Sequence, residues 1–337
     1  MSDYFRTLSE RLGAGWNRFW FTPTDPLTLC ALRVCVGLIA TYTIFTYSFD
    51  LLSLWGPDAL LPTGVVRSLQ EGRVRFSYLD YVHSPAQLWT VHALGLAVMV
   101  LFTVGFATRV TSVLALVVFV SYAHRAIMLT SQYEPIIALL LFYLCLGPAG
   151  AYLSVDRWRA ARRRGPTSAV ALVAPSYAAT IACRLIQVHL TVVYVMMALG
   201  KISAIVWWNG TAAWWLMINS RDPLLDFSDL RNRAIAENST SVGSRGAIYL
   251  INAWTHLILA FELSFPLLAW NRLTRPLILA IGVLVWALVA VLTGLVSFAL
   301  VMVVANLAFL TPDQMRSLLG LVGYRPTAAD PAASGAR

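Results

Sequence analysis

The stretch that decides the fold runs from Arg184 to Met217 and reads RLIQVHLTVVYVMMALGKISAIVWWNGTAAWWLM. It begins as an apolar run long enough to cross a bilayer, ends at Lys201, and continues into a tryptophan-rich segment. Lys201 is the only lysine in the chain. An amine that is removed from water can lose its proton, whereas arginine keeps its charge at any ordinary pH. The lone lysine therefore predicts a chemical use for its proton.

The composition of the whole chain is typical of a membrane protein. Of its 337 residues, 58% are hydrophobic and only 12% are charged, and apolar runs recur along nearly the entire sequence. The formal net charge is +9, but the arginines lie at the ends of apolar runs and not on a patterned face of a soluble domain. The charge therefore indicates membrane topology. We expect the lipid bilayer as a partner and no nucleic acid.

The apolar runs predict an all-α, polytopic helical membrane protein with about eight spans. The spans are expected near residues 27–49, 88–107, 110–129, 133–149, 176–200, 247–270, 276–295 and 297–310. The last span is short and could instead be half-buried or re-entrant. An amphipathic basic segment over residues 1–26 precedes this transmembrane domain of residues 27–312, and no cleaved signal peptide is expected. The tail over 313–337 is expected to be flexible, and its part from Pro326 (PTAADPAASGAR) is rich in Ala, Pro, Gly and Ser.

The placement of the arginines predicts the orientation of the spans. With the amino terminus inside, the dense run RWRAARRR at 157–164 also lies inside, and acids balance the arginines of the two long outer loops, 50–87 and 202–246. An even number of spans returns the tail to the inner side, so both termini are expected in the cytoplasm. A ninth partial span would break this arrangement. We expect a multi-pass protein of the inner or plasma membrane of a bacterium.

Ionisable and polar residues concentrate in the outer leaflet of the predicted spans. They are His92, His124, Arg125, Tyr133, Glu134, Lys201, Asn252 and His256. A charge at the centre of a span costs about 2.5–3.5 kcal/mol on insertion scales, so such residues indicate a functional site. As a group they predict a polar cavity that opens outward near Lys201. Taken singly, each could be an interfacial residue whose polar tip reaches water.

The helix that ends at Lys201 carries a polar stripe. Gln187, Thr191, Tyr194, Ala198 and Lys201 fall on one helical face, so the stripe is expected to face the interior of the bundle and lead to the lysine. This makes Tyr194 a candidate cofactor-binding residue.

Two arginines, Arg33 and Arg184, lie in the inner halves of their spans and each needs a partner. Glu262 lies at a suitable depth, and we expect a structural ion pair there in preference to a functional site.

Four tryptophans follow the lysine: Trp207, Trp208, Trp214 and Trp215. Tryptophan prefers the headgroup level of a bilayer because its ring is apolar and its N–H needs a partner. The cluster is therefore either an aromatic belt or a lid over a pocket at the outer end of the preceding span. The second interpretation makes Trp208 a candidate cofactor-binding residue.

Other classes of site are not supported by the sequence. The four cysteines (Cys30, Cys35, Cys145 and Cys183) lie in apolar segments without metal-ligand spacing, so free buried thiols are expected. The histidines lack acids paired with them on one helix, so no metal is expected. There is no P-loop and no dinucleotide-binding fingerprint. A transporter is disfavoured because inverted repeats and paired glycine-broken spans are missing.

Several stretches between about residues 19 and 312 resemble the horizontally transferred transmembrane (HTTM) domain family, which includes vitamin K-dependent gamma-glutamyl carboxylase. They are GFATRVTSVL (105–114), YLSVDRW (152–158), QVHLTVVYVMMALGKISAIVWWNG (187–210), FELSFPLLAW (261–270) and LVSFALVMVVANLAFLTP (295–312). The most specific similarity is a tyrosine seven residues before the lysine, followed by Trp and Gly. The resemblance implies a helical membrane fold of eight or nine spans.

The resemblance also implies a chemistry. In the family's carboxylase, the matching lysine is the base that deprotonates the reduced quinone. The resemblance therefore implies that Lys201 deprotonates reduced vitamin K or menaquinone. Oxygen then yields a strong base that removes the γ-proton of a substrate glutamate, carbon dioxide adds, and the quinone epoxide is released. This is lyase-type carboxylation without a metal. The residues expected to bind the cofactor are Tyr133, Glu134, His124, Arg125, His256, Tyr194 and Trp208.

The chain departs from the family pattern at two positions and in its extent. Tyr133 stands where the carboxylase has the histidine of an Asn-Asn-His stretch, and Trp286 stands where the family often has a histidine. The large outer domain that receives the substrate propeptide has no counterpart here. An enzyme with these departures could still oxygenate a quinone. The alternative is a non-catalytic membrane partner in maturation or export of a peptide, as in short bacterial relatives linked to toxin-peptide processing.

Overall fold

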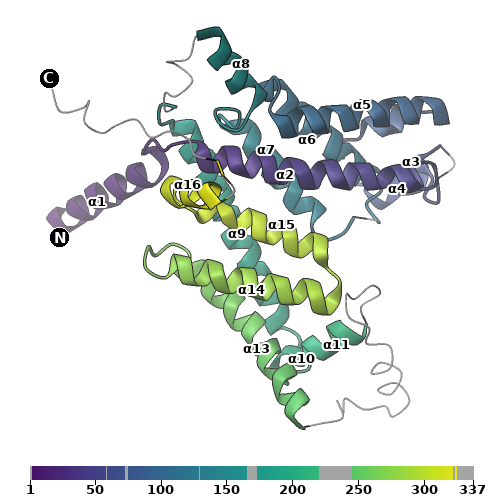
Figure 1. The fold of residues 1–337 in the computed structure, drawn as a ribbon. Coiled ribbons are helices and arrows are strands. Elements are labelled where there is room, and N and C mark those ends of the chain that lie inside the picture. The colour runs from purple at the N-terminus through teal and green to yellow at the C-terminus, as the bar shows by residue number, and fades with distance from the viewer. Residues whose placement is uncertain are drawn as a thin grey trace. The chain divides into compact units, whose positions relative to one another are not determined.

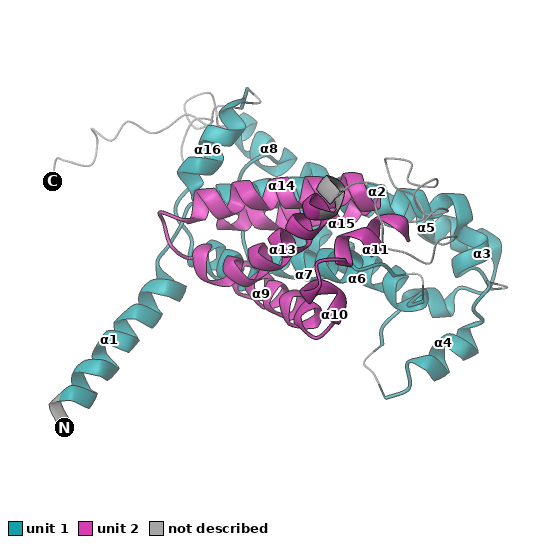
Figure 2. Cartoon of the chain, turned by 90° about the horizontal axis from the view of Figure 1, so that it is seen from below, with its two compact units in different colours: residues 1–186, 310–337 teal, residues 187–309 magenta. Residues whose placement is uncertain are grey.

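The computed structural model of the chain is helical (Figure 1). It describes residues 2–57, 59–72, 75–128, 130–164, 173–219, 245–321 and 323–324. Within these ranges the β-structure is a single antiparallel bridge between Thr24 and Ser176. The chain divides into two compact units, residues 1–186 with 310–337 and residues 187–309 (Figure 2), and each is described by itself.

Four apolar helices form the centre of unit 1. They are α2 (Leu27–Thr46), α5 (Pro85–Val104), α6 (Thr108–Arg125) and α7 (Glu134–Leu146). Helix α2 packs against α5 and α7, and α6 lies against α5 and α7. Local sequence sets the ends of α5. The Ser84 hydroxyl accepts the backbone N–H of Gln87, Pro85 occupies the first turn, and Gly105 ends the helix at φ +75°, where a side chain would be strained.

Further helices complete unit 1. The segment between α2 and α5 contains η1 (Tyr47–Asp50), α3 (Leu51–Trp55), α4 (Thr63–Leu69) and η2 (Tyr78–Tyr81). The remaining elements are α1 (Ser2–Phe21), α8 (Val155–Arg164) and α16 (Pro312–Leu321). Helix α9 (Tyr177–Ile202) begins in unit 1 and continues into unit 2.

Unit 2 surrounds the second half of α9. Its other elements are α10 (Ile205–Trp208), α11 (Ala212–Ile218), α13 (Arg245–Leu268), α14 (Arg275–Thr293), α15 (Val296–Asn306) and η4 (Leu307–Phe309). Helix α14 packs against α13 and α15, and α11 lies against α13 and α14. Buried aromatic rings fill the space between these helices, with Tyr194 stacked on Phe265 at a centroid distance of 3.9 Å.

Five helices in the described part of the chain are long and apolar enough to cross a membrane. They are Leu27–Trp55, Pro85–Val104, Tyr177–Ile202, Tyr249–Leu268 and Arg275–Thr293. Helix α7 and the segment Val296–Phe309 are apolar but shorter. Every expected span coincides with a helix to within several residues. The all-α membrane class is therefore confirmed in its coarse form, while the count of eight spans stays a prediction.

The predicted flexible tail is wrong over its first residues, because the chain forms α16 there. Met315 is buried, and Arg316 forms ion pairs with Asp25 and Asp313. Composition could not reveal this, since α16 packs on α2, almost three hundred residues earlier. Residues 325–337 lie outside the described part of the chain.

Candidate functional site

Lys201 forms an ion pair with a buried carboxylate. Its Nζ atom, in the last turn of α9, donates to Oε1 of Glu262 in α13 at 2.8 Å. The Glu262 side chain is 1% exposed and that of Lys201 is 19% exposed. The second carboxylate oxygen, Oε2, is buried without a hydrogen-bond partner among the described residues. The pair is thus closed around Glu262 and open to a small extent at Lys201.

An aromatic ring lies beside the lysine. After α9 the chain turns at Ala204, and α10 brings the ring of Trp207 to 5.2 Å from Nζ of Lys201. Trp207 is 9% exposed, whereas its neighbour Trp208 is 60% exposed and donates Nε1 to the carbonyl of Ile202. The sequence pointed to Trp208, but the structure places Trp207 against the lysine. Adjacent residues on a helix point in different directions, which the cluster alone could not resolve.

The polar stripe of α9 faces the interior of unit 2, as predicted. The hydroxyl of Tyr194 is fully buried and accepts hydrogen bonds from Trp286 Nε1 and Asn306 Nδ2, both at 3.0 Å. Two turns earlier, Gln187 donates to the carbonyl of Ala308 at 2.7 Å. Trp286 thus supplies an N–H to the tyrosine. These contacts fix α9 against α14 and α15, and so fix the position of Lys201.

The tryptophan segment is anchored to α13 through Thr255, which sequence reasoning missed. Its buried hydroxyl donates to the carbonyl of Gly210 at 2.9 Å and accepts the backbone N–H of Ala213 at 3.0 Å. Gly210 has φ +76°, and a Cβ there would lie 2.8 Å from Asn252. His256, a predicted cofactor-binding residue, is exposed and bonds to the carbonyl of Asn252 in its own helix. Nothing in the sequence around Thr255 indicates that its hydroxyl bonds to the backbone of Gly210 and Ala213.

The expected ion pair of Glu262 with Arg33 or Arg184 is wrong. Glu262 pairs with Lys201 within unit 2. Arg33 is buried and donates to the carbonyl of Leu153, and the guanidinium of Arg184 lies 4.4 Å from the ring centroid of Phe19. Depth along a span limits which charges can meet, but it does not say which helices face each other.

Glu134 lies in a separate cluster in unit 1. It is buried in the first turn of α7, and its Oε1 accepts the Tyr47 hydroxyl at 3.4 Å. The ring of Tyr47 lies 4.4 Å from that of Trp55 and 5.9 Å from that of Tyr122. Tyr133, next to Glu134, is half-buried.

A buried histidine completes this cluster. Nε2 of His92 lies 2.8 Å from the Ser48 hydroxyl, and Nδ1 lies 2.8 Å from the Tyr122 hydroxyl. The sequence placed His92 in the outer leaflet but offered no reason to join it to these hydroxyls. Its ring nitrogens are both satisfied, as buried polar groups require.

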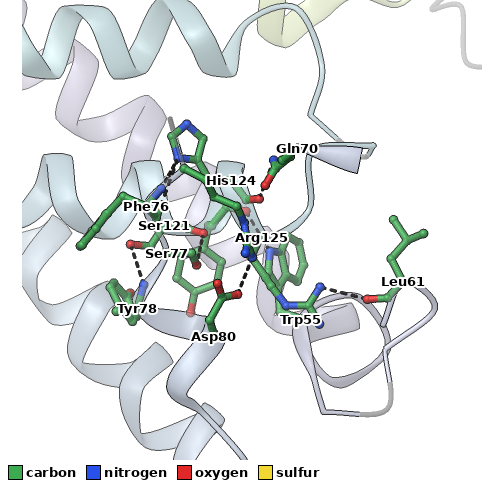
Figure 3. Close-up of polar contacts among 12 residues, drawn as sticks. Trp55, Leu61, Gln70, Phe76, Ser77, Tyr78, Asp80, Ser121, His124 and Arg125 are labelled. Carbon is green, nitrogen blue, oxygen red and sulfur yellow. Dashed lines mark hydrogen bonds and ion pairs between the residues drawn. The ribbon is translucent and has the colours of Figure 1, made fainter. Parts of the chain in front are cut away.

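His124 and Arg125 bind backbone of the segment between α2 and α5, as Figure 3 shows. Nδ1 of His124 accepts the backbone N–H of Phe76 at 3.2 Å. Arg125 is buried and donates to the carbonyls of Leu61 (3.0 Å) and Gly56 (3.4 Å). Nδ1 of His124 and both terminal nitrogens of Arg125 therefore fix backbone near the end of α6. Both side chains were predicted to bind a cofactor, and that role stays a prediction.

The stretches YLSVDRW (152–158) and GFATRVTSVL (105–114) meet in unit 1. Asp156, from YLSVDRW, accepts the backbone N–H groups of Ala107 and Thr108 and the Thr108 hydroxyl, each at 2.8 Å. Ala107 and Thr108 belong to GFATRVTSVL. Burial acts to raise the pKa of Asp156, but these hydrogen bonds and the nearby Arg33 outweigh it, so the pKa lies below its usual range. The motifs therefore cap α6 and have a structural use.

The eight candidate residues fall in both units. Lys201, Tyr194, Trp208 and His256 belong to unit 2, and His124, Arg125, Tyr133 and Glu134 belong to unit 1. A single outer cavity that joins them stays a prediction. Within the described ranges, no three His, Cys, Asp or Glu side chains are grouped to hold a metal ion. Comparison with protein-family models, curated proteins and solved structures gives no match.

Proposed function

We propose that the protein is a membrane enzyme in which Lys201 and Glu262 take a proton from a lipid-soluble hydroxyl compound. The observation that carries the proposal is the 2.8 Å contact between the only lysine of the chain and a carboxylate that is 1% exposed. A buried ion pair adds little to stability, because the loss of water costs several kcal/mol per ion. A purely structural contact could be made by apolar residues, so the pair points to proton chemistry.

The two groups can share one proton between Nζ and Oε1. With the proton on Glu262, Lys201 is a neutral amine that can accept a proton from a hydroxyl. With the proton on Lys201, the unpartnered Oε2 of Glu262 is a free acceptor. In both cases the proton of the substrate passes to the pair. An arginine could not take the place of Lys201, since it does not release its proton.

The proposed substrate is a reduced quinone, vitamin K or menaquinone, as in the HTTM family. The residues fit an apolar ring that carries hydroxyl groups, because Glu262 has an unpartnered acceptor and is paired with the partly open Lys201, whose Nζ lies 5.2 Å from the centroid of the Trp207 ring. When bound, the quinone supplies the redox chemistry with oxygen and carbon dioxide. The protein's own part is to orient the hydroxyl, exclude water and remove the proton. Tyr194, with its hydroxyl already bonded to Trp286 and Asn306, positions α9.

We also propose eight spans with both termini in the cytoplasm of a bacterium. This rests on the helices that coincide with the eight apolar runs and on the arginine run at 157–164. Reporter fusions after residue 57 and after residue 164 test the part of this topology that covers the first four spans. A periplasmic reporter should be active only at the first position, and a cytoplasmic reporter only at the second.

The experiment that tests the enzyme is quinone turnover. The protein in nanodiscs is given vitamin K hydroquinone or menaquinol with oxygen, and the epoxide is measured by mass spectrometry. Wild type and Tyr249→Phe should form epoxide, while Lys201→Ala, Lys201→Arg and Glu262→Gln should not. Tyr249 is a suitable control because it is exposed and lies in the same helix as Glu262. Epoxide from Lys201→Arg at the wild-type rate would contradict the proposal.

A second candidate is a non-catalytic partner in the maturation or export of a peptide. It is favoured by the fact that the Lys201–Glu262 pair ties α9 to α13, which a scaffold also needs. It predicts that folded wild type forms no epoxide and that an exported peptide or a protein with an outer domain co-purifies with it. Labelled carbon dioxide and a glutamate-containing peptide, added to the same assay, separate oxygenation from carboxylation.

A further inference from the structure

Helix α1 divides into an apolar and a polar face. At about 100° per residue, the large apolar side chains from Tyr4 to Trp20 fill a sector roughly 160° wide, and only Phe21, the last residue of the helix, lies outside it. They are Tyr4, Phe5, Leu8, Leu12, Trp16, Phe19 and Trp20. The opposite face carries Arg6, Glu10, Arg11, Asn17 and Arg18. The glutamate lies near the middle of the polar face and the arginines lie near its two borders.

No described part of unit 1 covers the apolar face. Tyr4, Phe5, Leu12 and Trp16 are 62–67% exposed, and every residue from Tyr4 to Arg18 is exposed. Figures 1 and 2 both show α1 extending away from the other helices of its unit. Only at its base do Phe19 and Trp20 become half-buried. A continuous face of this size in water would be unfavourable, so it needs a partner.

The position of α1 in the chain indicates what that partner is. The helix ends at Phe21, and α2, the first candidate span, begins at Leu27. The five residues between them keep α1 close to the membrane surface from which α2 enters. Tyr4, Trp16 and Trp20 are residues that favour the headgroup level. Border arginines can extend their heads toward lipid phosphates while their stems cover the apolar face.

We propose that α1 lies in the plane of the bilayer and binds an anionic lipid surface. The apolar sector enters the boundary between headgroups and acyl chains, and Arg6, Arg11 and Arg18 contact the phosphates. Helices that combine a large apolar face with a charged opposite face lie in the interface in this way and do not cross the bilayer. The lipid is chosen over a second copy of the chain because basic borders and interfacial aromatics match phosphate headgroups. The inference does not depend on the proposed enzyme.

The test uses the full chain in nanodiscs that hold one copy each. A cysteine is placed on the apolar face in Leu12→Cys, or on the polar face in the matched control Glu10→Cys, and is labelled with an environment-sensitive fluorophore. The unsubstituted protein measures labelling of the four native thiols. The label at position 12 should be quenched by lipids with brominated acyl chains, and its quenching constant for aqueous iodide should be several-fold lower than at position 10.

The lipid charge and the arginines give a second readout. Nanodiscs that contain phosphatidylglycerol should protect the label at position 12 from iodide more than discs of phosphatidylcholine alone. Replacement of Arg6, Arg11 and Arg18 by Gln should bring the ratio of the iodide quenching constants in the two kinds of nanodisc close to one. Equal iodide quenching at positions 10 and 12 would overturn the proposal. So would a label at position 12 that is protected from iodide but not quenched by brominated lipid, because its partner would then be protein.

Discussion

Lys201 Nζ donates to Glu262 Oε1 at 2.8 Å, across 61 residues of sequence, and the carboxylate that accepts this bond is almost completely buried. The pair joins the end of α9 to the last third of α13 within unit 2. Glu262 is almost completely buried, whereas Lys201 is partly exposed to solvent. The first prediction follows from this difference.

Removal of Lys201 alone should destabilise the protein more than removal of both partners. In Lys201→Met, Glu262 is left buried without its partner, which typically costs about 3–5 kcal/mol. Adding Glu262→Met should recover most of the loss, since apolar pairs often replace buried ion pairs without cost. The thermal midpoint of the two single variants and the double variant in detergent measures this as a double-mutant cycle. A double variant as unstable as the sum of the single variants would show that the pair is not coupled.

The hydroxyl of Tyr194 should contribute to the stability of the folded protein. Tyr194→Phe keeps the stacking on Phe265 but leaves Trp286 Nε1 and one donor of Asn306 without their acceptor. An unsatisfied buried donor costs about 1–3 kcal/mol, so the thermal midpoint should fall clearly. Tyr249→Phe is the matched control, because Tyr249 is exposed in the same unit. An unchanged midpoint in Tyr194→Phe would mean that the network carries no net stability.

The helices were predicted well from the sequence, because helix formation is a property of local patterns. The apolar runs indicated every membrane-length helix, and the spacing of Gln187, Tyr194 and Lys201 indicated the buried face of α9. The start of α16 also has a local signal. The Thr311 hydroxyl accepts the backbone N–H of Gln314, and the Gln314 side chain accepts that of Thr311. This reciprocal pair is a capping box and could have placed the helix.

Contacts between helices could not be predicted in the same way. Glu262 was assigned to Arg33 or Arg184 from depth alone, and the structure pairs it with Lys201. His124 and Arg125 were interpreted as ligands because charge in a span is costly, and the sequence did not reveal that backbone groups between α2 and α5 bond to His124 Nδ1 and to the Arg125 guanidinium. Which residues satisfy a buried charge depends on packing between segments distant in sequence, and one sequence does not contain that information locally.

Asp156 should make stability depend on pH in the acidic range. Its pKa is lowered in the folded protein, so its contribution is present above the unfolded value of about 3.9 and is lost as the pH falls through the folded value. Asp156→Ala should lower the thermal midpoint at pH 7 by the equivalent of about 0.5–2 kcal/mol, the usual value of a helix cap. The gap between variant and wild type should narrow below about pH 4.

The control for this prediction is Asp50→Ala, which removes an exposed carboxylate in the same unit. Its midpoint should follow that of the wild type at every pH. A gap for Asp156→Ala that stays constant from about pH 7 to about pH 3, on both sides of the ordinary carboxyl pKa, would mean that the charge of Asp156 is not what stabilises the start of α6.

His92 should be a structural residue whose role a glutamine can partly fill. In His92→Phe, the hydroxyl of Tyr122 loses its hydrogen-bond partner, and Tyr122 as a whole is only 1% exposed. The Ser48 hydroxyl also loses its partner, but Ser48 is half-buried and can turn toward water. We expect a loss of about 1–3 kcal/mol, dominated by Tyr122. His92→Gln keeps an amide that can reach one hydroxyl and should recover part of that loss. Because the tyrosine is the buried member, Tyr122→Phe combined with His92→Phe should be more stable than His92→Phe alone.

His256→Phe, at an exposed site, is the control for this prediction and should leave the thermal midpoint unchanged. An equal loss of stability in that control would show that the effect comes from the phenylalanine and not from the broken hydrogen bonds.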